Sequence, residues 1–438
     1  MASLFKSVAA ICSVAFGLAA CGDQEILLEG ERQDIRGEES AALSRAAVPV
    51  PISLGAPVAN ANWTHSMATP SHKIAHPVLD RRLTRQWTTT IGEGNGRKHR
   101  LTADPVVSGG RIYTLDSRAT VMAHIAENGR TLWSRDLTPS SDRADDASGG
   151  GLAVSGDTLF VTSGFGMLTA MEAATGETRW VQKLDAAATG APTVADGRVY
   201  VVARDNLAWA LDAENGRILW QKLGVPAISS LTGGAAPAVD GPLVMMPFSS
   251  GQIMAVIANT GATAWVASVP GRRLGRAFSR ISDLAGDPVA DGRRVYAGNH
   301  SGRVAAFEGA TGQIAWVAEE GAIGPLWVTG GSVFFVSDEA QLLRLDAETG
   351  DIIWAQDLPF FTKNRISRRK GTFAHFGPII AGGRLLVVSD DGFMRAFDPA
   401  SGSLIEQIEL PGDAASNPVV AGGVLYLLTD KGELHAFR

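Results

Sequence analysis

The chain of 438 residues has only two cysteines, Cys12 and Cys21, and both lie within its first 21 residues. The rest of the sequence can therefore form neither a disulfide bond nor a thiolate metal site. Positive charge is not in excess either, because the formal net charge is −6. A protein without a global positive field is a poor candidate for binding nucleic acid, so we expect no nucleic-acid partner.

Common catalytic motifs are also missing. The sequence contains no G-x-S-x-G elbow, no H-E-x-x-H and no Walker motif. Gly92–Gly96 is rich in glycine, but it follows no expected parallel strand and precedes no expected helix, as a phosphate cradle requires. We therefore expect no catalytic residue, no cofactor-binding residue and no bound metal.

The first 20 residues have the pattern of an export signal. Lys6 supplies positive charge, and the apolar stretch from Ser7 to Ala20 follows it. That stretch is shorter than the roughly 20 apolar residues that span a bilayer, and it has the length of a signal-peptide core. We therefore predict a signal peptide over residues 1–20.

The end of this segment, Leu18-Ala19-Ala20-Cys21, resembles the bacterial lipobox. The resemblance implies that Cys21 becomes the new N-terminus and carries a lipid. Acyl chains contribute about 0.8 kcal/mol per buried CH₂, which makes such an anchor effectively permanent. Gly22 stands where an Asp commonly signals inner-membrane retention, so the outer membrane is favoured, on its periplasmic face. The alternative is an ordinary secretory signal that is cleaved after an alanine beside an incidental cysteine.

Residues 21–80 show no regular periodicity. The stretch DQEILLEGERQDIRGEES is rich in charge, and VPVPISLGAP is rich in proline. Both compositions are typical of a linker, so we expect a flexible, lipid-anchored tether over 21–80. His72 and His76 have i,i+4 spacing, but no acidic residue accompanies them and Pro77 disfavours a helix. We expect them to pack against the domain and not to bind a metal.

From about residue 81 the sequence is dominated by repeats. Six units end in the same way, with tryptophans 38 to 51 residues apart, as TLW133, TRW180, ILW220, TAW265, IAW316 and IIW354. Each tryptophan follows a glycine turn such as ENGRILW. Upstream lie short apolar stretches with period two, such as RVYVVA and RLLVVS, separated by Asp-Gly or Gly-Gly turns. Such stretches and turns predict four antiparallel strands per unit.

The count of units gives eight. A seventh unit has Glu406 in place of the tryptophan, and an eighth begins at Pro418 and stops at Arg438 after three strands. Its missing strand is RLTRQWTTTIG, at the start of the repeat region. We therefore predict an all-β fold over residues 81–438: an eight-bladed β-propeller of four-stranded antiparallel blades whose N-terminal strand closes the last blade. The tryptophans are expected to pack between blades. A closed ring leaves few free strand edges, so we expect a monomer.

The blade ending seen in LDAENGRILW and LDAETGDIIW resembles the tryptophan-docking motif of quinoprotein-type propellers. Two families share it. One is the pyrroloquinoline quinone (PQQ) dehydrogenases, and the other is the BamB family of lipoproteins in the outer-membrane β-barrel assembly complex. The dehydrogenases have a vicinal cysteine pair over the quinone, which this chain lacks.

The lipobox, the length and two loops favour BamB. FSRISDLAGDPV (278–289) and VPAISSLTGGAAPAV (225–239) are similar to two BamB loops that contact the barrel subunit BamA. The resemblance extends over residues 61–438 and implies a partner-binding set of Leu231, Thr232, Arg280, Ser282 and Asp283. The sequence departs from the family at Thr232, where an arginine is frequent, and at Ala285, where an acidic residue is expected.

The function that this resemblance implies is that of a scaffold and not of an enzyme. The resemblance implies that such a scaffold binds a BamA-like subunit and aids the assembly and insertion of outer-membrane proteins. Nascent outer-membrane proteins are further candidate partners. Three clusters of basic residues in the inter-blade links, at 97–100, 272–280 and 363–370, favour an acidic protein partner. Two alternatives stay open: a PQQ-dependent periplasmic oxidoreductase, and a propeller that binds sugar or peptidoglycan.

Overall fold

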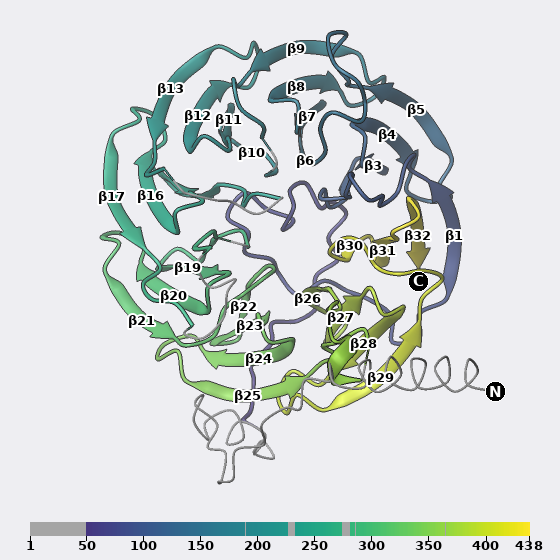
Figure 1. Ribbon diagram of the computed structural model, residues 1–438, viewed down its shortest axis with the longest axis vertical. Coiled ribbons are helices and arrows are strands. Elements are labelled where there is room, and N and C mark those ends of the chain that lie inside the picture. The colour runs from purple at the N-terminus through teal and green to yellow at the C-terminus, as the bar shows by residue number, and fades with distance from the viewer. Residues whose placement is uncertain (1–49, 189, 227–232, 274–280, 285, 364) are drawn as a thin grey trace, which may run out of the picture. The chain divides into compact units, whose positions relative to one another are not determined.

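The computed structural model describes residues 50–438 except 189, 227–232, 274–280, 285 and 364. These residues belong to one compact unit, Arg45–Arg438. Its described strands form eight four-stranded antiparallel sheets, and Figure 1 shows them arranged around a centre like the blades of a propeller. The predicted all-β, eight-bladed architecture is thus confirmed.

The first four blades follow one another along the chain. Their strands are β2 (Val106–Ser108), β3 (Arg111–Leu115), β4 (Thr120–Ile125) and β5 (Thr131–Asp136) in blade 1; β6 (Gly150–Ser155), β7 (Thr158–Ser163), β8 (Met167–Glu172) and β9 (Thr178–Lys183) in blade 2; β10 (Thr193–Ala195), β11 (Arg198–Val202), β12 (Leu207–Asp212) and β13 (Ile218–Leu223) in blade 3; and β14 (Ala238–Asp240), β15 (Leu243–Pro247), β16 (Gln252–Ile257) and β17 (Thr263–Ser268) in blade 4.

The other four blades complete the ring. Their strands are β18 (Val289–Ala290), β19 (Arg294–Asn299), β20 (Arg303–Glu308) and β21 (Ile314–Ala318) in blade 5; β22 (Trp327–Thr329), β23 (Ser332–Val336), β24 (Gln341–Asp346) and β25 (Ile352–Asp357) in blade 6; β26 (His375–Ala381), β27 (Arg384–Ser389), β28 (Phe393–Phe397) and β29 (Leu404–Glu409) in blade 7; and β30 (Val419–Ala421), β31 (Val424–Leu428), β32 (Glu433–Phe437) and β1 (Arg85–Thr90) in blade 8. A 3₁₀ turn, η2 (Ile366–Arg368), lies between β25 and β26.

The burial of each strand follows its place in the blade. The second strand of blade 2, β7, is buried along its whole length, because both faces of the sheet pack on neighbouring blades. The outer strand β13 is mostly exposed. The turn between β10 and β11 has positive φ at both Asp196 (48°) and Gly197 (71°). A two-residue hairpin turn of this kind requires that conformation, which Asp-Gly readily adopts.

The repeated tryptophans hold adjacent blades together, as predicted. Trp133 ends blade 1, and its Nε1 donates a hydrogen bond to the carbonyl of Ala173 in blade 2, at 3.2 Å. The indole also covers Gly176, where a Cβ atom would lie only 2.6 Å from Cε3 of Trp133. The same pair of contacts, an indole bond to a carbonyl and a glycine under the ring, recurs at Trp180, Trp220, Trp265, Trp316 and Trp354.

The ring closes non-covalently through β1. This strand pairs with β32 in antiparallel register, with Trp87 opposite Ala436. Reciprocal backbone bonds of 2.7 and 2.9 Å join Thr84 to Arg438 at the end of the ladder. The strand from the start of the repeat region therefore completes the last blade, as the sequence predicts (Figure 1).

Glu406 replaces the tryptophan of blade 7 because blade 8 cannot receive an indole there. In the other blades the indole covers the glycine turn that joins the third and fourth strands of the next blade, but in blade 8 these strands, β32 and β1, are not joined by a turn. Glu406 instead lies 3.5 Å from Arg384. That guanidinium donates to the carbonyls of Asp80 and Arg81, both at 2.6 Å. An ion pair and two backbone bonds thus replace the indole.

Residues 50–82, hereafter the cross-ring segment, run across the middle of the ring (Figure 1). The segment bonds to the innermost strand of one blade after another. Bonds to its backbone carbonyls or to the His65 imidazole come from the amides of Val107, Val154, Val194, Val239, Ala290, Gly382 and Gly422, and the guanidinium of Arg344 in blade 6 binds the Val50 carbonyl. The innermost strands are sheet edges, and the segment supplies hydrogen-bond acceptors that those edges otherwise lack.

The expectation of a flexible tether over 21–80 is therefore wrong for its second half. Trp63 and Met67 are 1% and 2% exposed and join the largest hydrophobic core. The Nδ1 atom of His72 lies 2.8 Å from the carbonyl oxygen of Pro288. A Pro-rich stretch with few charges between residues 50 and 80 can fold when an apolar surface and free amides are available to it. Residues 21–49 lie outside the described part of the chain. In that described part, no helix is long and apolar enough to cross a membrane.

Candidate partner-binding face

The two faces of the ring differ in what they carry. Turns between first and second strands, and between third and fourth strands, lie on one side, which we call the turn face. The cross-ring segment bonds near these turns, for instance at Gly382 and Gly422. The links between blades and the turns between second and third strands lie on the opposite side, which we call the link face. Both loops expected to bind a partner belong to the link face.

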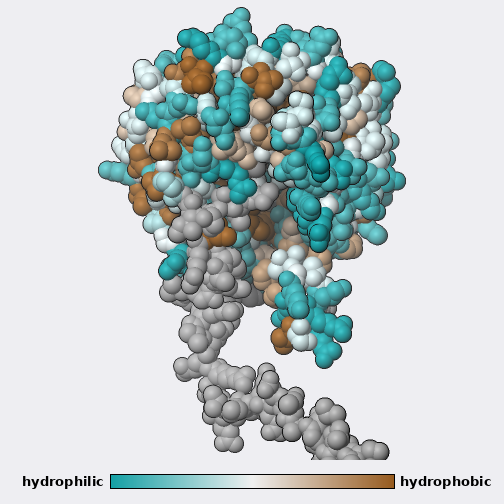
Figure 2. Space-filling view, turned by 45° about the horizontal axis from the view of Figure 1, so that its top comes forward, coloured by the Kyte–Doolittle hydropathy of each residue, from teal (hydrophilic) through white to brown (hydrophobic). Residues whose placement is uncertain are grey.

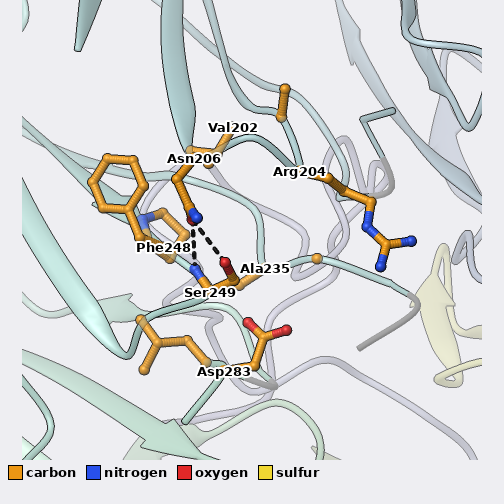
Figure 3. Close-up of a pocket in the computed structure, with 11 residues that line it drawn as sticks. Val202, Arg204, Asn206, Ala235, Phe248, Ser249 and Asp283 are labelled. Carbon is orange, nitrogen blue, oxygen red and sulfur yellow. Dashed lines mark hydrogen bonds between the residues drawn. The ribbon is translucent and has the colours of Figure 1, made fainter. Parts of the chain in front are cut away.

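A cleft opens on the link face where blades 3, 4 and 5 meet (Figure 3). Its cavity measures about 40 Å³, whereas pockets for drug-sized ligands span roughly 300–1,000 Å³. A cleft of this size fits a side chain of a partner better than a free cofactor. The lining consists of Val202, Ala203, Arg204, Asn206, Gly234, Ala235, Pro247, Phe248, Ser249, Asp283 and Leu284.

Asn206 joins the turns of blades 3 and 4 at one side of the cleft. Its Oδ1 accepts hydrogen bonds from the Ser249 amide, at 3.0 Å, and from the Ser249 hydroxyl, at 2.8 Å, as Figure 3 shows. Asn206 has a φ of 62°, a left-handed conformation that asparagine tolerates better than most residues. The two turns are therefore fixed to each other before any partner arrives.

Asp283 and Leu284 form the other side of the cleft. The Asp283 carbonyl accepts a bond of 3.0 Å from the amide of His300, and Leu284 forms an antiparallel bridge with Asn299 of β19. The Asp283 carboxylate is turned towards the cleft (Figure 3) and is only 6% exposed. This part of the link is held on blade 5, so its position is set by the propeller.

The structure describes two of the expected partner-binding residues. Ser282 is exposed at the rim of the cleft, and Asp283 lines it. Leu231, Thr232 and Arg280 lie outside the described residues, as does the expected lipid-bearing Cys21. Sequence reasoning missed the cleft residues of blades 3 and 4, chiefly Arg204, Asn206 and Ser249. The sequence did contain a signal for these residues. They lie in turns between second and third strands, and such turns share a face with the links.

The three basic link clusters are not equivalent in their contacts within the ring. In the cluster at 272–280, Arg273 donates to Asp338 at 3.0 Å and to Glu320 at 2.8 Å. Burial raises the pKa of Glu320, and the neighbouring guanidinium opposes that shift. In the cluster at 97–100, His99 lies 3.4 Å from Asp145. The charge of Arg273 is therefore used within the ring, whereas among the described residues Arg97, Lys98 and Arg100 have no carboxylate within ion-pair distance.

Polar side chains in the middle of the ring bind one another. Both carboxylate oxygens of Asp104 accept bonds of 2.8 Å, from the amide and the side chain of Asn417. Asp287 accepts from the Ser66 hydroxyl of the cross-ring segment and from the Ala236 amide. Protein donors thus hold both of these carboxylates in place. No group of three or more His, Cys, Asp or Glu among the described residues could hold a metal.

Comparison with known proteins agrees with this architecture. The family model described as outer membrane protein assembly factor BamB matches residues 117–356 and 364–438. The assembly factor BamB of Yersinia pestis is 26% identical over 329 residues, which cover 74% of this chain and 80% of the relative.

Two solved structures share the fold. The crystal structure of BamB from Moraxella catarrhalis superposes with a TM-score of 0.68 at 22% identity, covering 82% of this chain and all of that one. Quinohemoprotein alcohol dehydrogenase from Comamonas testosteroni reaches a TM-score of 0.67 at 16% identity, covering 86% and 80%. At such identities each likeness shows the fold alone. The family model, by contrast, spans most of the chain, and the chain therefore belongs to the BamB family of outer membrane protein assembly factors.

Proposed function

We propose that this chain is a non-enzymatic scaffold in the assembly of outer-membrane proteins, and that its link face docks on a BamA-like barrel subunit. Membership of the BamB family supports the assembly role. The observation that supports the docking site is the cleft between blades 3, 4 and 5, because both loops that resemble the BamA-contacting loops of the family border it.

The cleft offers a partner a rigid frame whose lining contains both a cation, Arg204, and a carboxylate, Asp283. Asn206 and Ser249 fix its first side, and the backbone of Asp283 and Leu284 is held on β19 at the second. A prearranged site loses little conformational freedom on binding, which favours affinity. Ser282 at the rim would contact a side chain inserted into the cleft. Leu231, Thr232 and Arg280 are proposed as further contacts on the resemblance of their loops alone.

Cys21 supplies the second part of the proposal, a lipid that holds the propeller at the periplasmic face of the outer membrane. Replacement of Cys21 by serine should release the protein into the soluble periplasmic fraction. Persistence of the Cys21→Ser protein in washed outer membranes would contradict the anchor without touching the docking site.

Strand edges on the outer rim suit a further role, contact with nascent outer-membrane proteins. Figure 2 shows hydrophobic spots scattered over an otherwise largely hydrophilic surface. On β13, Ile218 and Leu223 are 42% and 66% exposed beside a free backbone edge. An extended apolar chain can add to such an edge through main-chain hydrogen bonds.

The docking site is tested by co-purification from detergent-solubilised envelope. Arginine at position 282, in the exposed rim of the cleft, should reduce recovery of the barrel subunit at least tenfold. Ser403→Arg is the matched control, because Ser403 is exposed on the turn face of blade 7 and receives the same change. Equal recovery with Ser282→Arg and with Ser403→Arg would reject this site. Asp283 is unsuitable for charge reversal, because a cationic side chain at this buried position would disturb the fold.

A further inference from the structure

In the link between blades 6 and 7, the described residues 360–363 and 365–373 form a hairpin of their own, which we call the basic hairpin. Phe361 and Thr372 form an antiparallel bridge. The Thr362 amide donates to the Gly371 carbonyl at 3.0 Å, and the Phe373 amide donates to the Phe360 carbonyl at 2.8 Å. The rings of Phe360 and Phe361 lie 4.6 Å apart at its base. Backbone hydrogen bonds thus hold the base of the hairpin together.

The tip of the basic hairpin combines positive charge with one bare apolar side chain. Ile366 is 80% exposed, although a side chain of this kind is normally buried. Five cations surround it in the sequence, all of them exposed: Lys363, Arg365, Arg368, Arg369 and Lys370. No acidic residue occurs between Asp357 and Asp390. In a chain of net charge −6, this is a sharp local reversal of sign.

Four cations of the hairpin are less engaged within the protein than Arg273 of the cluster at 272–280. Among the described residues, Lys363, Arg365, Arg368 and Lys370 have no carboxylate within ion-pair distance, whereas Arg273 contacts Glu320 and Asp338. Arg369 packs over the ring of Phe361, with 4.8 Å from Cζ to the ring centroid. The hairpin therefore presents its charge outwards.

We propose that the basic hairpin docks on an anionic phospholipid surface. Its guanidinium and ammonium groups would meet lipid phosphates, and Ile366 would enter the boundary between headgroups and acyl chains. An acidic protein would neutralise the cations equally well but gives no reason for an exposed isoleucine among them. The proposal does not depend on binding of a barrel subunit.

The test is sedimentation of the soluble unit, residues 45–438, with phospholipid vesicles. The closed ring, its cores and the cross-ring segment all lie within this compact unit, and omission of residues 1–44 removes the proposed lipid and the signal segment. We expect binding to vesicles of phosphatidylglycerol and phosphatidylcholine in equal parts, weakened by salt, and little binding to phosphatidylcholine alone.

Two variants separate charge from insertion. The triple change Arg365→Gln, Arg368→Gln and Lys370→Gln should weaken vesicle binding roughly 100-fold, at about fivefold for each cation removed. Ile366→Ser should weaken it about tenfold, because the apolar contribution is lost. Thermal unfolding of both variants should match the parent, since all four side chains are exposed.

The matched control removes three exposed cations elsewhere, through Arg130→Gln, Lys183→Gln and Arg217→Gln. An equal loss of vesicle binding in this control would overturn the proposal, because it would show a general effect of net charge. Absence of binding to anionic vesicles, or binding that Ile366→Ser leaves unchanged, would overturn it as well. Capture by poly-glutamate without capture by vesicles would assign the hairpin to an acidic protein instead.

Discussion

The indole of Trp87 lies directly over Gly129, so that a Cβ atom on this glycine would stand 2.5 Å from Cε3 of the ring. Trp87 belongs to the strand that closes blade 8, and Gly129 belongs to the turn between β4 and β5 of blade 1. This contact is the one place where the repeated tryptophan–glycine pairing joins the two ends of the propeller.

Substitution of Gly129 by alanine should destabilise the ring strongly. The residue has a φ of 72°, which costs a residue with a Cβ about 1 kcal/mol, and the collision with Trp87 adds about 2 kcal/mol more. We expect a fall of about 3 kcal/mol in the free energy of unfolding, measured by urea denaturation. Gly110→Ala is the control, since Gly110 has a φ of 73° but no neighbour near a Cβ. Similar losses in both variants would show that only backbone strain is at work.

The cross-ring segment should contribute to stability like a part of the core. Truncation of Trp63 to alanine removes a side chain that is 1% exposed and should cost about 3–5 kcal/mol. Limited proteolysis should then cut between residues 50 and 80. Val58→Ala on the same segment, where the side chain is 48% exposed, should change stability by less than about 0.5 kcal/mol. A Trp63→Ala protein as stable as the Val58→Ala protein would show that the segment is dispensable.

Two buried titratable groups should change the free energy of unfolding with pH in opposite directions. Burial, reinforced by His72, lowers the pKa of His65 to about 3. Burial, reinforced by Asp287, raises the pKa of Asp104 to about 7 against the bonds from Asn417. Between pH 4 and 6.5 the unfolded chain binds one more proton at His65 and one fewer at Asp104. The two effects on stability therefore cancel in the parent.

Single variants should expose each slope. Asp104→Asn leaves the His65 effect, so stability should rise with pH by about 1.4 kcal/mol per unit between pH 4 and 6.5. His65→Gln leaves the Asp104 effect, so stability should fall with pH at the same rate. Urea denaturation at several pH values measures both. Parallel pH profiles for the two variants would contradict the assignment of these pKa values.

The ion pairs of Arg273 should matter more than those of exposed arginines. Arg273→Gln leaves the Asp338 and Glu320 carboxylates, whose side chains are 1% and 9% exposed, without their cation. Loss of one partner from a buried pair costs about 3 kcal/mol. Arg293→Gln breaks a pair whose side chains are 61% and 59% exposed and should cost less than about 1 kcal/mol. Equal thermal shifts in the two variants would mean that the Arg273 network is solvated.

The expected residues of the partner site could be located only in part. The sequence indicated the two link loops, and the structure shows that Asp283 of the second loop lines a cleft with Asn206 and Ser249. Nothing in the spacing of these residues reveals their meeting, because they come from three different blades. The sequence could assign the turn between second and third strands to the link face. It could not indicate which side chain of that turn points into the cleft.

The sequence by itself determined the repeat, the number of blades and the strand that closes them. These features are local. Period-two apolar stretches and tight glycine turns recur along the repeats, a tryptophan precedes the link in every unit except the seventh, and each repeat forms the same four-stranded sheet. Only the tertiary structure decided that residues 50–82 are ordered and packed across the ring. The Ser66 hydroxyl bonds to Asp287, 221 positions away, and a segment without periodicity carries no signal of such a partner. This segment becomes ordered because the closed ring provides backbone amides to bond and an apolar surface to pack on. Both exist only once the blades have assembled.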